Sequence, residues 1–265
     1  MKRIIYLFPI VLLVFFSCNN QKEVLTETVL IYCDLSNSVT EESMTIVANK
    51  IESFVAEIDT GSKVQLFIYP IDDNIYSEPL VDTLLASVAE FTQNKDQQRR
   101  KKLQQEHRQI AAAVKQKLLE VYHMNMQQGS TGFQSCIINT LEVATRKLHH
   151  APGVKKSLIY FSDMLEECPQ VNGQRVYWCS PRIGNEAREE QLHELLPEPL
   201  NLQAEVGEHL YVVVTTGNDL SNDCITPQQK RQYWATLFGQ VGFSADFVAN
   251  MQFDSQIPHR THGNH

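Results

Sequence analysis

Short apolar runs rich in β-branched residues alternate with helical stretches along this chain, and the alternation restricts its fold more than any other feature. A continuous apolar run such as "TVLIYC" is typical of a central strand covered on both faces. The predicted strands are residues 28–33, 63–71, the apolar part of 155–167, 209–217 and 244–248. The predicted helices are residues 41–58, most of 80–126, the amphipathic stretch that follows the turn near 130, and 226–243. This order predicts an α/β fold, a three-layer sandwich with a central, mostly parallel sheet flanked by helices.

The long helical stretch has a polar middle that contains a basic run, Arg99 to Lys102. This middle is interpreted either as part of one long solvated helix or as the tip of a helical hairpin. We interpret the basic run as a solvated helix face, with contact to acidic lipid or nucleic acid as the less favoured alternative. The formal charge of the whole chain is −8, which argues against nucleic acid as the main partner.

The first residues have the pattern of a signal peptide. A basic start, "MKR", precedes an apolar stretch from Ile4 to Phe16. As a helix this stretch would span about 20 Å, less than the bilayer core of about 30 Å. Its ending, "VFFSC", resembles a bacterial lipoprotein signal, in which Cys18 is lipidated and becomes the new N-terminus. We therefore expect a signal peptide at 1–18, a polar tether at 19–26 and a lipid-anchored protein of the bacterial cell envelope. The alternative is an ordinary secretory signal with an incidental cysteine.

Export to the envelope would permit disulfide bonds. Cys168 and Cys179 lie in one loop-like stretch and form the candidate disulfide. Cys33 ends a predicted strand and Cys136 lies in a predicted helix, so both are interpreted as small buried hydrophobic residues.

Acidic and hydroxyl side chains gather where predicted strands end. Asp34 and Asp163 are each the first acid after an apolar strand, and in an open α/β sheet ligands bind beyond the carboxyl ends of the strands. Ser36 and Ser38 are two residues apart in an extended segment, so both hydroxyls can face one ion. Thr131 begins the helix that precedes the strand of Asp163. Oxygen ligands without imidazole or thiolate suit a hard cation such as Mg²⁺, which takes six oxygens at about 2.1 Å.

The pattern "DLSNS" from Asp34 to Ser38, followed by Thr131 and Asp163, resembles the metal-ion-dependent adhesion site (DxSxS…T…D) of von Willebrand factor type A domains. The resemblance assigns residues 27–250 to such a domain, with a long helical insertion at about 92–128. The last residues, "HRTHGNH", have no apolar content, so we expect a disordered tail at 251–265. One position departs from the family pattern, because Met164 follows Asp163 where glycine is common.

The resemblance implies a Mg²⁺ ion (or Mn²⁺ or Ca²⁺) that Ser36, Ser38 and Thr131 touch directly. Asp34 and Asp163 would bind the same ion directly or through water. Type A domains of this kind hold a protein partner by its carboxylate, so the resemblance implies metal-dependent protein binding rather than catalysis.

Two other functions stay open at this stage. A phosphohydrolase of the haloacid dehalogenase type would use Asp34 as its nucleophile, but Ser36 stands where those enzymes need the acid/base carboxylate. A structural envelope protein would keep the metal site only as a vestige. The sequence contains no GxSxG, P-loop or HExxH motif, so we expect no enzyme activity.

Overall fold

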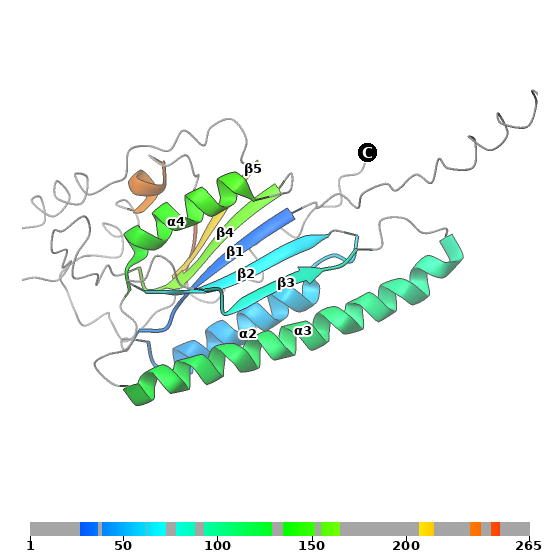
Figure 1. Cartoon of the computed structure of the whole chain (residues 1–265), viewed down its shortest axis with the longest axis horizontal. Helices are drawn as coiled ribbons and strands as arrows, with labels where there is room; N and C mark the ends of the chain where they lie inside the picture. Colours follow the sequence, from blue (N-terminus) through cyan, green and yellow to red (C-terminus); the bar gives the residue numbers. More distant parts are fainter. Residues whose placement is uncertain are drawn as a thin grey trace, which may run out of the picture.

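The computed structural model describes residues 27–36, 39–61, 63–72, 78–87, 93–128, 135–151, 155–164, 207–214, 234–239 and 245–249. Its strands are β1 (Glu27–Asp34), β2 (Val64–Ile71), β3 (Val81–Leu85), β4 (Lys155–Ser162), β5 (Gly207–Val214) and β6 (Ala245–Ala249). Its labelled helices are α2 (Glu41–Glu57), α3 (Gln93–Gln128) and α4 (Ile137–His150), and residues 234–239 add a short helix. Figure 1 shows these elements along the chain.

The strands form one six-stranded sheet in the order β3-β2-β1-β4-β5-β6. Neighbouring strands are parallel except at the β2–β3 pair, which is antiparallel. From β1 the sheet grows outward through β2 and β3 in one direction and through β4, β5 and β6 in the other. This is the strand order of doubly wound sheets, in which ligands bind where the order reverses, here between β1 and β4.

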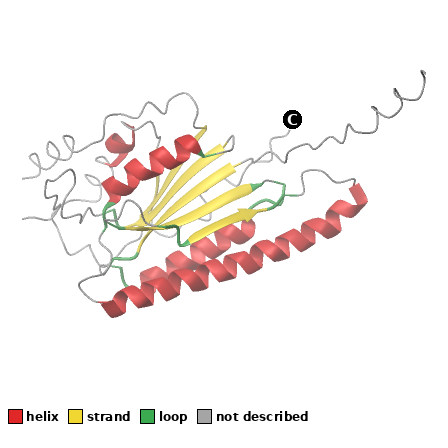
Figure 2. Cartoon of the chain, in the orientation of Figure 1, coloured by secondary structure: helices red, strands yellow, loops and turns green. Residues whose placement is uncertain are grey.

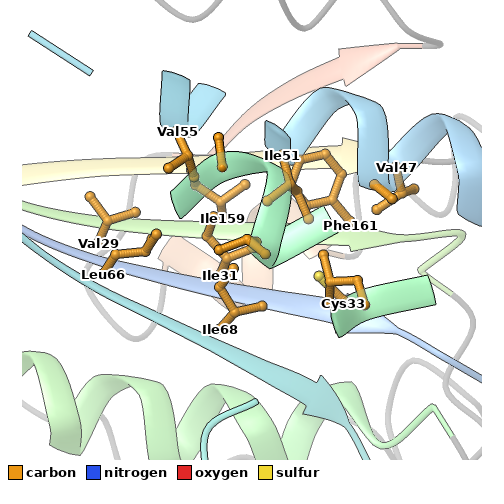
Figure 3. Close-up of a cluster of buried hydrophobic side chains, with 14 of the residues drawn as sticks. Val29, Ile31, Cys33, Val47, Ile51, Val55, Leu66, Ile68, Ile159 and Phe161 are labelled. Atoms are coloured by element: carbon orange, nitrogen blue, oxygen red, sulfur yellow. The ribbon is translucent and has the colours of Figure 1, made fainter. Parts of the chain in front are cut away.

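Helices cover both faces of the sheet, which confirms the predicted three-layer α/β sandwich (Figure 2). The helices α2 and α3 pack together on one face, and α4 lies on the other. Every second residue of β1, Val29, Ile31 and Cys33, faces α2 in a buried hydrophobic core (Figure 3). Because side chains alternate along a strand, Tyr32 and Asp34 point to the α4 face.

Helix α2 begins where its sequence favours a helix start. The hydroxyl of Thr40 accepts a hydrogen bond from the backbone N–H of Ser43 at 3.2 Å, so Thr40 is the N-cap. Glu41 and Glu42 follow in the first turn, where negative charge interacts favourably with the helix dipole. This start fixes where the loop between β1 and α2 ends.

The helix predicted from residue 80 onward is wrong at its beginning, because Val81–Leu85 is the edge strand β3. The segment "VDTLL" alternates between more and less exposed positions, which is the period of a strand rather than a helix. From Gln93 the chain is one continuous helix to Gln128, so the polar middle belongs to a long helix and not to a hairpin.

The helix α3 runs along one face of the sheet, from the edge where the parallel strands begin to the edge where they end (Figure 1). We call the edge where the parallel strands begin the amino rim, and the edge where they end the carboxyl rim. Near the amino rim the buried ring of His107 bridges two backbone carbonyls, with Nδ1 at 3.3 Å from Ile58 O and Nε2 at 3.3 Å from Ala86 O. At the carboxyl rim, Tyr122 and Asn125 bond the loop that follows β1. These contacts fix the position of α3 at both rims.

None of the helices in the described segments is both long enough and apolar enough to cross a membrane.

Candidate metal centre

The carboxyl ends of β1 and β4 bring two of the predicted ligands to the point where the strand order reverses. Cys33 pairs with Phe161 in the parallel register, so Asp34 and Ser162 end neighbouring strands and Asp163 comes one residue later. Asp34 is 3% exposed, Ser36 1% and Asp163 5%. The structure therefore places three nearly buried oxygen-bearing side chains at the site expected from the sequence.

Asp34 is the centre of a hydrogen-bond network at this rim. Its Oδ1 accepts from the backbone N–H of Ser36 at 3.0 Å. Its Oδ2 accepts from the hydroxyls of Ser135 and Ser162, each at 2.9 Å. The donors come from the loop after β1, the segment before α4 and the end of β4, so Asp34 joins three parts of the chain.

The three hydrogen-bond donors to Asp34 are all neutral, so none of them offsets the negative charge of its carboxylate. A buried carboxylate is costly unless a positive charge lies beside it. In the described part of the chain, ion pairs join Lys102 to Glu106 and Lys115 to Glu52, and none includes Asp34. A divalent cation at the rim would supply the missing charge.

The donor set at the rim suits such a cation. No group of three or more His, Cys, Asp or Glu side chains within the described segments could hold a metal ion. The predicted centre is of a different kind, because it combines two carboxylates with hydroxyl groups, which are ligands for Mg²⁺. Ser38 and Thr131, the two other predicted ligands, lie outside the described residues.

Two hydroxyls were missed from the sequence. Ser135 and Ser162 were not in the predicted set, although both bond Asp34 directly. For Ser162 a signal was present, since a residue that ends β4 beside β1 faces the same way as Asp34. For Ser135 no signal was present, since it follows Thr131 by four residues in a turn-like stretch.

The loop after β1 is held from the α3 side by two buried polar side chains. The amide Nδ2 of Asn125 donates to Leu35 O at 2.6 Å, and the hydroxyl of Tyr122 donates to Val39 O at 2.8 Å. Within the loop, Val39 N donates to Ser36 O at 3.1 Å. Ser36 therefore sits in a loop whose backbone is fixed on both sides of it, as a metal ligand requires.

Asp163 is held by its neighbours in a comparable way. Met164 has φ 61°, in the left-handed region that favours glycine, and its side chain is fully buried. Its N–H donates to the hydroxyl of Ser162 at 2.9 Å, and its carbonyl accepts from Trp234 Nε1 at 2.9 Å. A left-handed residue favours glycine, and in Met164 burial and hydrogen bonding compensate for the strain.

We expect Met164→Ala to destabilise the fold more than Met164→Gly does, the reverse of the usual order. Both lose the burial of the Met side chain, roughly 1.5–3 kcal/mol. Only alanine keeps the cost of a left-handed residue, about 1–2 kcal/mol. Chemical denaturation of both variants measures the difference in free energy of unfolding. The control is Ala48→Gly in the middle of α2, where the wild-type alanine should be more stable than the glycine variant. If Met164→Ala proves as stable as Met164→Gly or more stable, the strained turn is contradicted.

A row of aromatic rings lies next to the site on the α4 face. The ring of Tyr32 stacks on Tyr69 at 5.4 Å and on Tyr160 at 5.3 Å between centroids, in the register of β2, β1 and β4. Burial, and then the charges of Tyr160, Tyr69 and Asp72, raise the pKa of the Tyr32 hydroxyl. That hydroxyl has no hydrogen-bond partner among the described residues. Tyr32, two residues before Asp34, is therefore a neutral, buried side chain beside the site.

The cysteines agree with the sequence interpretation in one case and not in the other. Cys33 is a free, fully buried thiol, as expected. Cys136 is also buried, but it is the N-cap of α4 and it is disulfide-bonded, so its interpretation as a plain hydrophobic residue is wrong. Its partner lies outside the described residues, as do Cys18 and the candidate pair Cys168 and Cys179.

No protein-family model matches the sequence, and no curated protein matches it either. Among solved structures, the PilB minor pilin from Streptococcus sanguinis is 12% identical with a TM-score of 0.46, over 88% of this chain and 59% of that protein, less than two thirds of its length. A von Willebrand factor type A protein from Catenulispora acidiphila is 13% identical with a TM-score of 0.38, over 85% of this chain and 39% of that one. The pilus adhesin SpaC from Lactobacillus rhamnosus GG is 10% identical with a TM-score of 0.42, over 87% and 29%. At these TM-scores the likenesses carry no weight, and the fold rests on the strand order.

Proposed function

We propose that this chain is a membrane-anchored module that binds a protein partner through a divalent cation held at the carboxyl rim. The observation that carries the proposal is Asp34. It is a carboxylate 3% exposed, bonded to neutral donors and placed beside Ser36 and Asp163 where the strand order reverses. A cation at this position would neutralise buried charge at the place where doubly wound sheets bind ligands.

The proposed ligands are Asp34, Ser36, Ser38, Thr131 and Asp163, as in the adhesion site of type A domains. A bound Mg²⁺ would supply positive charge and a coordination position that a carboxylate of the partner can fill. The chain's own residues orient the ligands. Asn125 and Tyr122 fix the loop of Ser36, and the Met164 turn fixes Asp163.

The anchor belongs to the same proposal. Lipidation of Cys18 would hold the module on the surface of the bacterial envelope, with the tether at 19–26 leading into β1. Two acyl chains give stable attachment, since each buried CH₂ contributes about 0.8 kcal/mol.

The test is a calorimetric titration of Mg²⁺ and of Mn²⁺ into the mature protein after treatment with EDTA, beside Ser36→Ala and a matched Ser53→Ala control. We expect saturable binding in wild type that Ser36→Ala weakens by about tenfold or more and the control leaves unchanged. Ser53 is a suitable control because it is exposed on α2, away from the loop between β1 and α2. Absence of any saturable binding to wild type would remove the metal from the proposal.

The partner is tested separately. Immobilised protein should capture an envelope protein in Mg²⁺, release it with EDTA and fail to capture it after Ser36→Ala. A rise in melting temperature with Mg²⁺ but no capture would favour a structural metal. Hydrolysis of a phosphate ester that Asp34→Asn abolishes would favour the phosphohydrolase.

A further inference from the structure

The amino-terminal part of α3 extends past the amino rim (Figure 1). Near that rim the buried ring of His107 lies with Nδ1 at 3.3 Å from Ile58 O, after α2, and with Nε2 at 3.3 Å from Ala86 O, after β3. The run Arg99–Lys102 lies five to eight residues before His107, so it stands about 8–12 Å further along the helix axis. All residues from Gln97 to Lys102 are exposed, and burial begins with Leu103. The basic run is thus carried on a continuous helix beyond the body of the domain.

This end of the molecule differs in charge from the rest. From Gln93 to Glu106, helix α3 contains five Lys and Arg residues against two Asp and Glu, a net charge of +3. Since the whole chain carries −8, the remainder carries −11. Four of the positive charges are consecutive in Arg99–Lys102. Lys102 Nζ lies 3.7 Å from Glu106 Oε1, but both side chains are exposed, so this ion pair is weak. The projecting end of α3 is therefore a cationic surface suited to an anionic one.

The proposed tether precedes β1, which begins at the same end of the molecule. Strand β1 begins at Glu27 on the amino rim, and Glu27 pairs with Val64 and Lys155, where the neighbouring parallel strands begin. Cys18 precedes Glu27 by nine residues, which span at most about 32 Å when fully extended. A lipid on Cys18 would thus hold the amino rim within about 32 Å of the membrane.

From these placements we propose that the amino-terminal end of α3 rests on the anionic headgroups of the membrane that carries the anchor. The inference depends on the lipid anchor of the proposed function, but not on its metal. Because α3 runs from the amino rim to the carboxyl rim, the contact directs Asp34 and its neighbours away from the membrane. Basic residues beside a lipid anchor add electrostatic attraction to anionic headgroups.

The test uses the lipidated protein in vesicles and compares two positions on the same helix. A small fluorescent non-canonical amino acid replaces either Gln97, before the basic run, or Met124, which is 50% exposed near the other end of α3. These positions are about 40 Å apart along the axis. Energy transfer to acceptor lipids is measured in phosphatidylcholine vesicles with and without phosphatidylglycerol.

With phosphatidylglycerol present, we expect transfer from position 97 to exceed transfer from position 124 several-fold. The difference should disappear in phosphatidylcholine alone, in about 1 M salt, where the screening length falls to about 3 Å, and in Arg100→Gln/Lys101→Gln. A matched double variant, Lys117→Gln/Arg146→Gln, removes two exposed charges elsewhere and should keep the difference.

Flotation of the vesicles distinguishes a missing lipid anchor from a missing contact between α3 and the headgroups. Protein that does not float with any vesicle lacks the anchor, which overturns both the anchor and this inference. Protein that floats but gives equal transfer from both positions in anionic vesicles overturns this inference alone. A response of the label at position 97 to a duplex oligonucleotide or to protein concentration, and not to anionic lipid, assigns the surface to nucleic acid or to a second copy and also overturns it.

Discussion

Asp34→Asn is expected to abolish Mg²⁺ binding and, in EDTA, to be at least as stable as the wild type. The asparagine can keep three hydrogen bonds. Its Oδ1 can accept from Ser36 N, as the Oδ1 of Asp34 does. Its Nδ2 can donate to the hydroxyls of Ser135 and Ser162, which in the wild type donate to Oδ2 of Asp34. It removes only the buried negative charge, which no basic side chain of the described segments offsets. Without metal, that charge is a cost, so its removal does not destabilise the fold.

With Mg²⁺ the order of the two proteins should reverse. A ligand at one hundred times its Kd stabilises the folded state by about 2.7 kcal/mol, and only the wild type gains this. Thermal unfolding of both proteins in EDTA and in saturating Mg²⁺ measures the reversal. Glu120→Gln removes an exposed carboxylate on α3 and should follow the wild type in both conditions. If the wild type shows no Mg²⁺-dependent shift, Asp34 is not a ligand.

Replacing Trp234 should affect both stability and metal affinity. Trp234 is fully buried, stacks on Phe238 at 5.6 Å and donates to Met164 O beside Asp163. We expect Trp234→Ala to lower the free energy of unfolding by about 3–5 kcal/mol. Trp234→Phe keeps most of the ring contact but leaves Met164 O without this donor, at a cost of about 1–3 kcal/mol.

The metal affinity separates support of the site from plain packing. Because the Met164 turn fixes Asp163, Trp234→Phe should weaken Mg²⁺ binding by about 10-fold or more, as loss of an outer-shell contact does. Phe238→Leu, which disturbs the stack but not the hydrogen bond, should lower stability and leave the affinity unchanged. Denaturant titration and calorimetry on the three variants decide between the two effects, and an unchanged affinity in Trp234→Phe would contradict a role for the turn.

The sequence predicted the sheet and the two acids at its rim for a simple reason. An apolar run long enough to cross a covered sheet is a strong signal, and the first acid after it must lie at the strand end, as Asp34 and Asp163 do. The edge strand β3 was missed because five residues with a weak alternation, next to a long helix, do not distinguish strand from helix.

The contacts of the site were less predictable than its position. Ser135 reaches Asp34 across 101 residues, and Asn125 reaches Leu35 across 90, through packing that no local pattern encodes. The departure at Met164 illustrates the same limit, because the sequence shows an unusual residue but not the Trp234 contact that holds it. Proposed ligands and their order could be predicted from the sequence, whereas the residues that fix them became evident only from the fold.

The reaction rate of the free thiol of Cys33 reports how often the sheet opens around it. It is fully buried in the hydrophobic core between the sheet and α2, one residue before Asp34, and burial and then the charge of Asp34 raise the pKa of its thiol. A thiol reacts as the thiolate, so Cys33 in the closed sheet is protected from reagents by burial and by protonation together. Its rate of modification therefore follows how often β1 separates from the sheet. Any cation or partner that holds the carboxyl rim closed slows that chemistry at a site it never touches.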